Sequence, residues 1–250
     1  MGDLHINMGI LGNQIESSGT VVAIYTTDYD GTTRPGPTTH SAGVAPDIGA
    51  DEFDGVILDI APPTISYVPL NNTSLTGGET LGNFATITDL GGVNGTIGTR
   101  PRLYYKRSTD PNSFGDNTSG TAGWKYDEAN GAGSPFTFTI DYTKLSGGTG
   151  VSVGNIVQYF VVAQDNALPT SNVGINSGTF AATPTSVALT GAAFPIGGAI
   201  NTYNIVTAYV GSINVGTSET ITSLTNANGL FDKMNNGALT GSLTDRKSVV

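Results

Sequence analysis

The residues best suited to chemistry are carboxylates crowded between positions 28 and 52. Asp28 and Asp30 precede Gly31 two residues apart, and Asp51 and Glu52 follow a stretch rich in Gly and Pro. Carboxylate oxygens are the ligands that Ca²⁺ prefers in proteins. If the coil folds back on itself, Asp28, Asp30, Asp51 and Glu52 could hold calcium, the one cofactor this sequence suggests.

A structural role for the same side chains is the interpretation we favour. The order Asp28-x-Asp30-Gly31 resembles the opening of an EF-hand loop, but no Glu stands where that loop would close. Asp side chains often bond the backbone of their own turn, and Arg34 could pair with Asp51 or Glu52. The cluster would then close a turn rather than bind an ion.

Catalytic chemistry has little support. A glycosidase needs two carboxyl groups facing each other across a sugar-binding cleft, and nothing in the sequence supplies that cleft. The two histidines, His5 and His40, are in no metal-ligand spacing, and neither a nucleophile elbow nor a phosphate-binding Gly-rich loop occurs. We therefore expect no catalytic residues here.

The aromatic side chains suggest a binding site. Trp124, the single tryptophan, follows a long polar stretch, and Tyr126 lies two residues beyond it. Exposed rings beside a loop could stack on sugar faces, so Trp124 and Tyr126 are candidate carbohydrate contacts. The alternative, which we favour for Trp124, is that the indole fills a hydrophobic core.

Composition narrows the classes of partner. The 250 residues carry a formal charge of −10, which disfavours nucleic acid and anionic membrane surfaces. With 35 Gly, 12 Pro and 12% charged residues, short strands joined by many turns are favoured over helices. Cysteine is absent, which removes disulfides and thiol chemistry. No apolar run is long enough to span a bilayer, so we expect no membrane insertion.

The strands expected from the residue pattern indicate an all-β chain of several modules, which would position these side chains. In residues 1–58, only the β-branched and aromatic run 21–25 predicts a strand. Such a small irregular segment cannot bury a core alone, so we expect it to cap a neighbouring β structure.

Residues 61–205 predict an antiparallel sandwich. Phe136, Phe138 and Ile140 alternate with polar residues, the period of a strand with one buried face. Residues 156–163 are apolar on both faces and predict a central strand. Further strands are expected at 84–87 and 103–106, and a long exposed hairpin loop at 108–123.

Residues 206–244 predict an incomplete β unit. Leu230, Phe231 and Met234 have the spacing of one short helix, which Gly237 can end. Residues 239–244 then predict the start of a strand. Residues 245–250 bring two basic residues side by side and resemble the translation of a sequencing adapter, so we expect this tail to be non-native and the chain to be a metagenomic fragment.

Three stretches also resemble parts of large secreted proteins of the Bacteroidetes type. The first resembles the end of a right-handed parallel β-helix repeat, through Asp3-Leu4-His5-Ile6, Asp28-Tyr29-Asp30-Gly31, Arg34-Pro35 and Pro46-Asp47-Ile48-Gly49-Ala50-Asp51-Glu52-Phe53. The middle resembles an immunoglobulin-like or fibronectin-III-like module, through Arg102-Leu103-Tyr104-Tyr105-Lys106, Gly123-Trp124-Lys125-Tyr126 and Val157-Gln158-Tyr159-Phe160-Val161-Val162-Ala163-Gln164-Asp165. The last resembles the start of another β-helix unit, through Leu224-Thr225-Asn226-Ala227-Asn228-Gly229-Leu230-Phe231 and Asn235-Asn236-Gly237.

These resemblances imply a non-catalytic structural, spacer or adhesion module of a secreted or cell-surface protein. The alternative is a carbohydrate-binding accessory region of a polysaccharide lyase or glycoside hydrolase whose catalytic β-helix lies upstream. The partners implied are extracellular polysaccharide or cell-surface components. No signal peptide begins the chain, and we expect that the natural N-terminus is truncated.

Overall fold

The computed structural model describes residues 12–36 and 45–247. These residues form strands, three 3₁₀ turns and one α-helix, so the chain is all-β, as the sequence predicts. The α-helix, α1 (Leu230–Asn235), begins at the predicted Leu230. No helix among the described residues has the length and apolar character needed to cross a bilayer.

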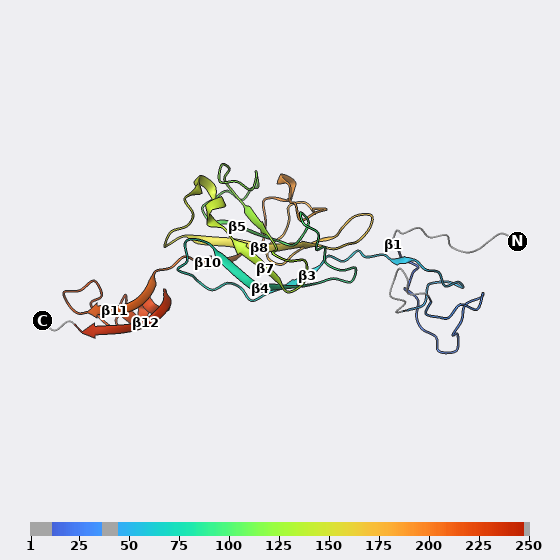
Figure 1. Ribbon diagram of the computed structural model, residues 1–250, viewed down its shortest axis with the longest axis horizontal. Helices are drawn as coiled ribbons and strands as arrows, with labels where there is room; N and C mark the ends of the chain where they lie inside the picture. The colour runs from blue at the N-terminus through green and yellow to red at the C-terminus, as the bar shows by residue number, and fades with distance from the viewer. Residues whose placement is uncertain (1–11, 37–44, 248–250) are drawn as a thin grey trace.

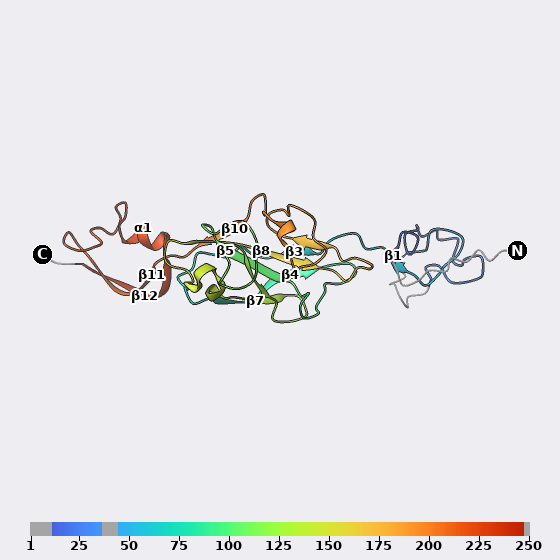
Figure 2. The ribbon, with the colours of Figure 1, turned by 90° about the horizontal axis from the view of Figure 1, so that it is seen from above.

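The elements lie in a row along the longest axis of the molecule (Figure 1). A parallel strand pair lies toward each end, and two antiparallel sheets lie between them. The view from above shows the same order (Figure 2). At one end β1 (Gly12–Asn13) pairs with β2 (Val56–Ile57), and at the other β11 (Ala208–Val215) pairs with β12 (Ala238–Lys247).

Two antiparallel sheets form the centre. The first has the order β3-β4-β7, and the second has the order β10-β8-β5-β6, with β9 also paired to β8. Their bounds are β3 (Thr64–Ser66), β4 (Glu79–Thr88), β5 (Arg102–Arg107), β6 (Lys125–Glu128), β7 (Phe136–Ile140), β8 (Ile156–Gln164), β9 (Val173–Ile175) and β10 (Asn201–Asn204). The 3₁₀ turns are η1 (Tyr142–Lys144), η2 (Ser146–Gly148) and η3 (Gly191–Ala193).

Strand β8 is central because it is apolar on both faces, as predicted. Val157, Tyr159 and Val161 join the core between the two sheets, where they meet the buried side chains of β4 and β7. Phe160 and Val162 point the other way, into a second core. The predicted alternation in β7 is also confirmed, since its apolar residues are buried and its threonines are half-buried.

The second core covers the outer face of the β10-β8-β5-β6 sheet. Residues 187–196 and Trp124 pack there against the outward side chains of β5 and β8. Gly123 makes the approach of Trp124 possible, because its φ of +100° is open to glycine and an added Cβ would collide with the Ser113 carbonyl. The loop 108–123 joins β5 to β6 as a hairpin, as predicted, and most of its residues are exposed.

One strand prediction is wrong. Residues 21–25 form a turn, closed by the Tyr25 amide donating to the Val22 carbonyl at 2.9 Å. Ile24 is 79% exposed. Residues of high β propensity form a strand only where a neighbouring strand accepts their hydrogen bonds, and no strand lies beside them among the described residues.

Strand β12 begins one residue before the predicted strand and runs on to Lys247. It therefore includes Asp245, Arg246 and Lys247, the first residues of the segment expected to be foreign. These three pair in parallel with Ile213, Asn214 and Val215 of β11.

Candidate functional site

Arg34 organises the acidic segment. Its Nε donates to Glu52 Oε1 at 2.6 Å, and its Nη2 donates to the carbonyls of Asp47 and Gly49 at 3.2 and 2.7 Å. The Glu52 carboxylate is buried and also accepts from the amides of Asp47 and Gly36. One ion pair thus ties together two stretches of chain that are 18 residues apart in sequence. We call this group, Arg34 with Glu52, the Arg34 brace.

Asp28 closes a turn beside the Arg34 brace. Its Oδ1 accepts from the amides of Thr32 and Asp30 at 2.7 and 3.0 Å, and its Oδ2 accepts from the Glu52 amide at 3.0 Å. Desolvation acts to raise the pKa of Asp28, but these hydrogen bonds outweigh it and hold the pKa below its ordinary value. The Asp28 side chain is therefore a charged carboxylate in the folded chain at neutral pH.

Two further buried carboxylates complete the segment. Asp47 accepts from the amides of Ser17 and Phe53 at 2.7 and 2.8 Å, and Glu16 accepts from the Gly55 amide at 2.8 Å. Carboxylates that bind backbone N–H groups satisfy donors that would otherwise be buried without a partner. Here they take the place of a hydrophobic core in a segment with few buried apolar side chains.

The four predicted calcium ligands therefore have different surroundings. The Asp28 carboxylate is bound to backbone amides, the Glu52 carboxylate is bound to backbone amides and to Arg34, Asp30 is exposed, and Asp51 is half-buried. Within residues 12–36 and 45–247, no three of these four place side-chain oxygens within 4.8 Å of one another. Calcium binding by Asp28, Asp30, Asp51 and Glu52 stays a prediction, which melting with and without a chelator tests. His5 and His40 lie outside the described residues.

The predicted carbohydrate contacts occupy the second core and its margin. Trp124 is fully buried, its Nε1 donates to Asn112 Oδ1 at 2.8 Å, and its ring lies 4.7 Å from that of Phe160. Tyr126 is half-buried, and the Arg102 guanidinium lies 4.1 Å from its ring centroid. A buried indole has no free face for a sugar, and the cation covers one face of Tyr126.

Three aspartates that the sequence analysis did not single out lie together where the chain enters the central sheets. Asp59, Asp89 and Asp165, here called the aspartate trio, each place an oxygen within 4.8 Å of the others. Desolvation by burial, followed by the negative charges of Asp59 and Asp165, raises the pKa of Asp89 to about 6. Such a group can share a proton or face a hard cation such as Ca²⁺.

Backbone amides hold the aspartate trio in place. The Gly91 amide donates to both Asp89 and Asp59, at 2.9 and 3.1 Å. Asp165 is fully buried and accepts from the Asn172 amide at 2.8 Å and from the Asn172 side chain at 2.7 Å. The only sign of the aspartate trio in the sequence is that Asp89 and Asp165 each directly follow a strand. Their convergence could not be predicted, because it depends on which strand ends meet in the fold.

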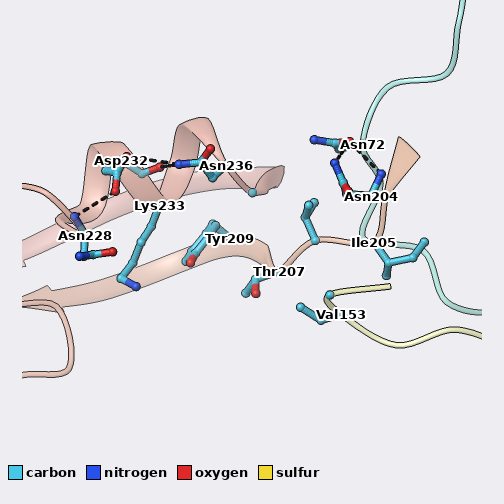
Figure 3. Close-up of a pocket in the computed structure, with 13 residues that line it drawn as sticks. Asn72, Val153, Asn204, Ile205, Thr207, Tyr209, Asn228, Asp232, Lys233 and Asn236 are labelled. Atoms are coloured by element: carbon cyan, nitrogen blue, oxygen red, sulfur yellow. Dashed lines mark hydrogen bonds between the residues drawn. The ribbon is translucent and has the colours of Figure 1, made fainter. Parts of the chain in front are cut away.

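A cleft of about 450 Å³ lies between the central sheets and the β11/β12 pair. Figure 3 shows Asn72 and Asn204 on the side of the sheets, and Asn228, Lys233 and Tyr209 on the opposite side. Its lining is rich in side-chain amides and has one aromatic ring. The sequence could not predict it, because residues 72, 153, 204 and 233 meet only after folding.

Comparisons with known proteins find no match for the chain. No protein-family model matches it, and neither a curated protein nor a solved structure matches it significantly.

Proposed function

We propose that this chain is a non-catalytic spacer within a secreted or cell-surface protein. The observation that carries the proposal is the arrangement in a row, with β1/β2 and β11/β12 on opposite sides of the central sheets (Figure 1). A module whose chain enters at one end and leaves at the other holds its neighbours apart.

The order of the central strands supports an immunoglobulin-like or fibronectin-III-like module. The chain crosses from the first sheet to the second between β4 and β5, returns between β6 and β7, and crosses again between β7 and β8. Repeated crossing between two antiparallel sheets is typical of Greek-key sandwiches of this kind. Modules with this architecture commonly occur as rigid units in cell-surface proteins.

The two terminal pairs support β-helix units on either side. Both are parallel, and parallel neighbours need long crossovers, which run here from residue 14 to 55 and from residue 216 to 237. Successive coils of a parallel β-helix stack in this way. We propose that β1/β2 belongs to the end of one such unit and β11/β12 to the start of the next.

Specific contacts stiffen both junctions, as a spacer requires. On the N-terminal side, the Asn172 side chain donates to the Asp59 carbonyl at 3.1 Å. On the C-terminal side, Thr73 and Ile205 form a parallel bridge, and the Val206 amide donates to the Thr73 carbonyl at 2.8 Å. The chain that leaves the sheets is thus paired for several residues before it reaches β11.

Small-angle X-ray scattering of the full chain tests the spacer role. A compact chain of 250 residues would have a radius of gyration of about 18 Å. A rod-like arrangement of the three parts predicts a clearly larger value and a pair-distance distribution skewed to long distances. A value near that of the compact chain would contradict the proposal.

A further inference from the structure

The cleft between the central sheets and the β11/β12 pair has the size of a ligand site. Its volume of about 450 Å³ falls in the range of roughly 300–1,000 Å³ typical of small-molecule sites. Both walls are anchored. Asn72 Oδ1 accepts from the Asn204 amide and side chain at 2.9 and 3.0 Å, and the Thr207 carbonyl accepts from the Ala238 amide at 2.9 Å.

Polar side chains of the cleft lining have hydrogen-bonding groups that face solvent. Within the part of the chain that the structure describes, the side-chain amides of Asn72 and Asn228 and the hydroxyl groups of Thr207 and Tyr209 donate to no protein group. Amides and hydroxyls both donate and accept. A ligand that fits this lining carries many groups that also do both, as sugar hydroxyls do.

The charge of the lining favours a neutral ligand. Lys233 is its one cation and Asp232 its one anion, so the two cancel. Asp232 is already engaged, since its Oδ2 accepts from the Asn228 amide at 2.9 Å and its Oδ1 from the Asn236 side chain at 3.2 Å. The chain as a whole carries −10, which disfavours a polyanion by long-range repulsion.

Tyr209 supplies a fixed aromatic group. Its ring lies directly against Gly237, where an added Cβ would come within 2.5 Å of the ring. The side chain is half-buried, so part of it faces the cleft. A ring held by the backbone beneath it loses little freedom on binding, which is the property of a stacking platform.

We propose that this cleft binds a neutral saccharide, with Tyr209 against the sugar ring and the amides of Asn72 and Asn228 on its hydroxyl groups. Lys233 adds a donor from helix α1 (Figure 3). The proposal goes beyond the spacer role and does not depend on it, because it rests on the lining of the cleft alone.

Amide chemical shifts of the full chain test the assignment. The probes are neutral oligosaccharides built from glucose, mannose or xylose, an oligomer of uronic acid, and an extended Gly/Ser peptide. We expect a neutral glycan to shift residues 72, 204–209 and 228–237. Tyr209→Ala should weaken that binding about three- to tenfold, and Asn228→Ala should also weaken it.

Two matched variants control for general effects. Tyr29→Ala removes a ring that is 89% exposed in the N-terminal segment, and Asn235→Ala removes an exposed amide of α1 outside the lining. Neither should change the affinity. Binding of the uronic acid oligomer or the peptide in preference to every neutral glycan, shifts confined to other parts of the chain, or no shifts at all would overturn the proposal.

Discussion

Replacing Asp89 by Asn should stabilise the chain at neutral pH and leave its stability at pH 4 nearly unchanged. The substitution removes one of the three charges of the aspartate trio and preserves the shape of the side chain. The amide oxygen can still accept from the Gly91 amide, which now donates to Asp89 Oδ1 at 2.9 Å. The amide nitrogen can donate to Asp59, so a repulsion becomes a hydrogen bond.

The direction of this effect follows from proton binding. Burial and the charges of Asp59 and Asp165 raise the pKa of Asp89 from 3.8 to about 6. Between these values the folded chain binds more protons than the unfolded chain, so the free energy of unfolding falls as the pH rises. The full penalty is present above pH 6 and absent below pH 3.8.

The size of the effect is modest. A shift of about two pKa units corresponds to about 3 kcal/mol, and solvent around the partly exposed side chain reduces this to about 1 kcal/mol. Asp89→Asn should then raise the melting temperature by about 2–4 °C at pH 7.5.

Thermal melting of the two proteins from pH 4 to pH 8, with a chelator present, measures this difference. Asp51→Asn makes the same chemical change outside the aspartate trio and should show no such pH-dependent gain. A stabilisation of equal size at pH 4 and pH 7.5, or a loss of stability at neutral pH, would refute the argument from charge repulsion.

Two other substitutions test the second hydrophobic core and the Arg34 brace. Phe160→Ala empties a fully buried site between the rings of Tyr104 and Trp124 and should cost about 3–5 kcal/mol, measured by denaturant unfolding with Trp124 fluorescence as the probe; an unchanged midpoint would contradict this packing. Arg34→Met leaves the buried Glu52 carboxylate without its cation and should cost about 1.5–3 kcal/mol locally. The cost should be seen as faster amide exchange in residues 16–36 and 45–55, whereas Asp51→Asn should leave that exchange as it is.

The central strands could be predicted because the pattern of apolar residues along each strand shows which of its faces are buried. The alternation in residues 136–140 and the two-sided apolar run of 156–163 each have one simple explanation, a strand with one buried face or a strand with two. Residues 21–25 carry the same residue types, yet they form an exposed turn. Strand propensity describes a residue that fits a pleated surface, and no sheet lies there for it to join.

Among the acidic groups, contacts within one segment could be predicted from the sequence, and contacts between distant segments could not. The turn made by Asp28 was expected because its partners lie two and four residues away, and the pairing of Arg34 was expected because Asp51 and Glu52 are acidic residues of the same segment. The aspartate trio and the cleft join residues from distant segments, so their geometry depends on how the strands cross between sheets. A single sequence shows which residues could take part but gives no measure of which ends of strands meet.

The Asn172 side chain contributes to the stiffness of the N-terminal junction, where the Gly91 amide also donates to Asp59 at 3.1 Å. Asn172 donates from its Nδ2 to the Asp59 carbonyl at 3.1 Å and to Asp165 Oδ2 at 2.7 Å, so it links the entering chain to the end of β8. Gly174 adds a close approach, because any Cβ there would strike the carbonyl of Pro63. The entering chain therefore runs tightly along β9, and Asn172 fixes its position.

Asn172→Ala should free this junction without unfolding the sheets. Losing both hydrogen bonds should cost about 1–3 kcal/mol, and the cost should appear as faster amide exchange at residues 58–61. The core amides of β5 and β8 should exchange as before. Thr170→Ala, two residues away at an exposed position, is the control and should change neither. Because a looser junction lets the N-terminal segment swing, scattering from Asn172→Ala should also show a broader pair-distance distribution. Faster exchange throughout the sheets would mean that Asn172 supports the fold as a whole, and the spacer would then owe its stiffness to other contacts.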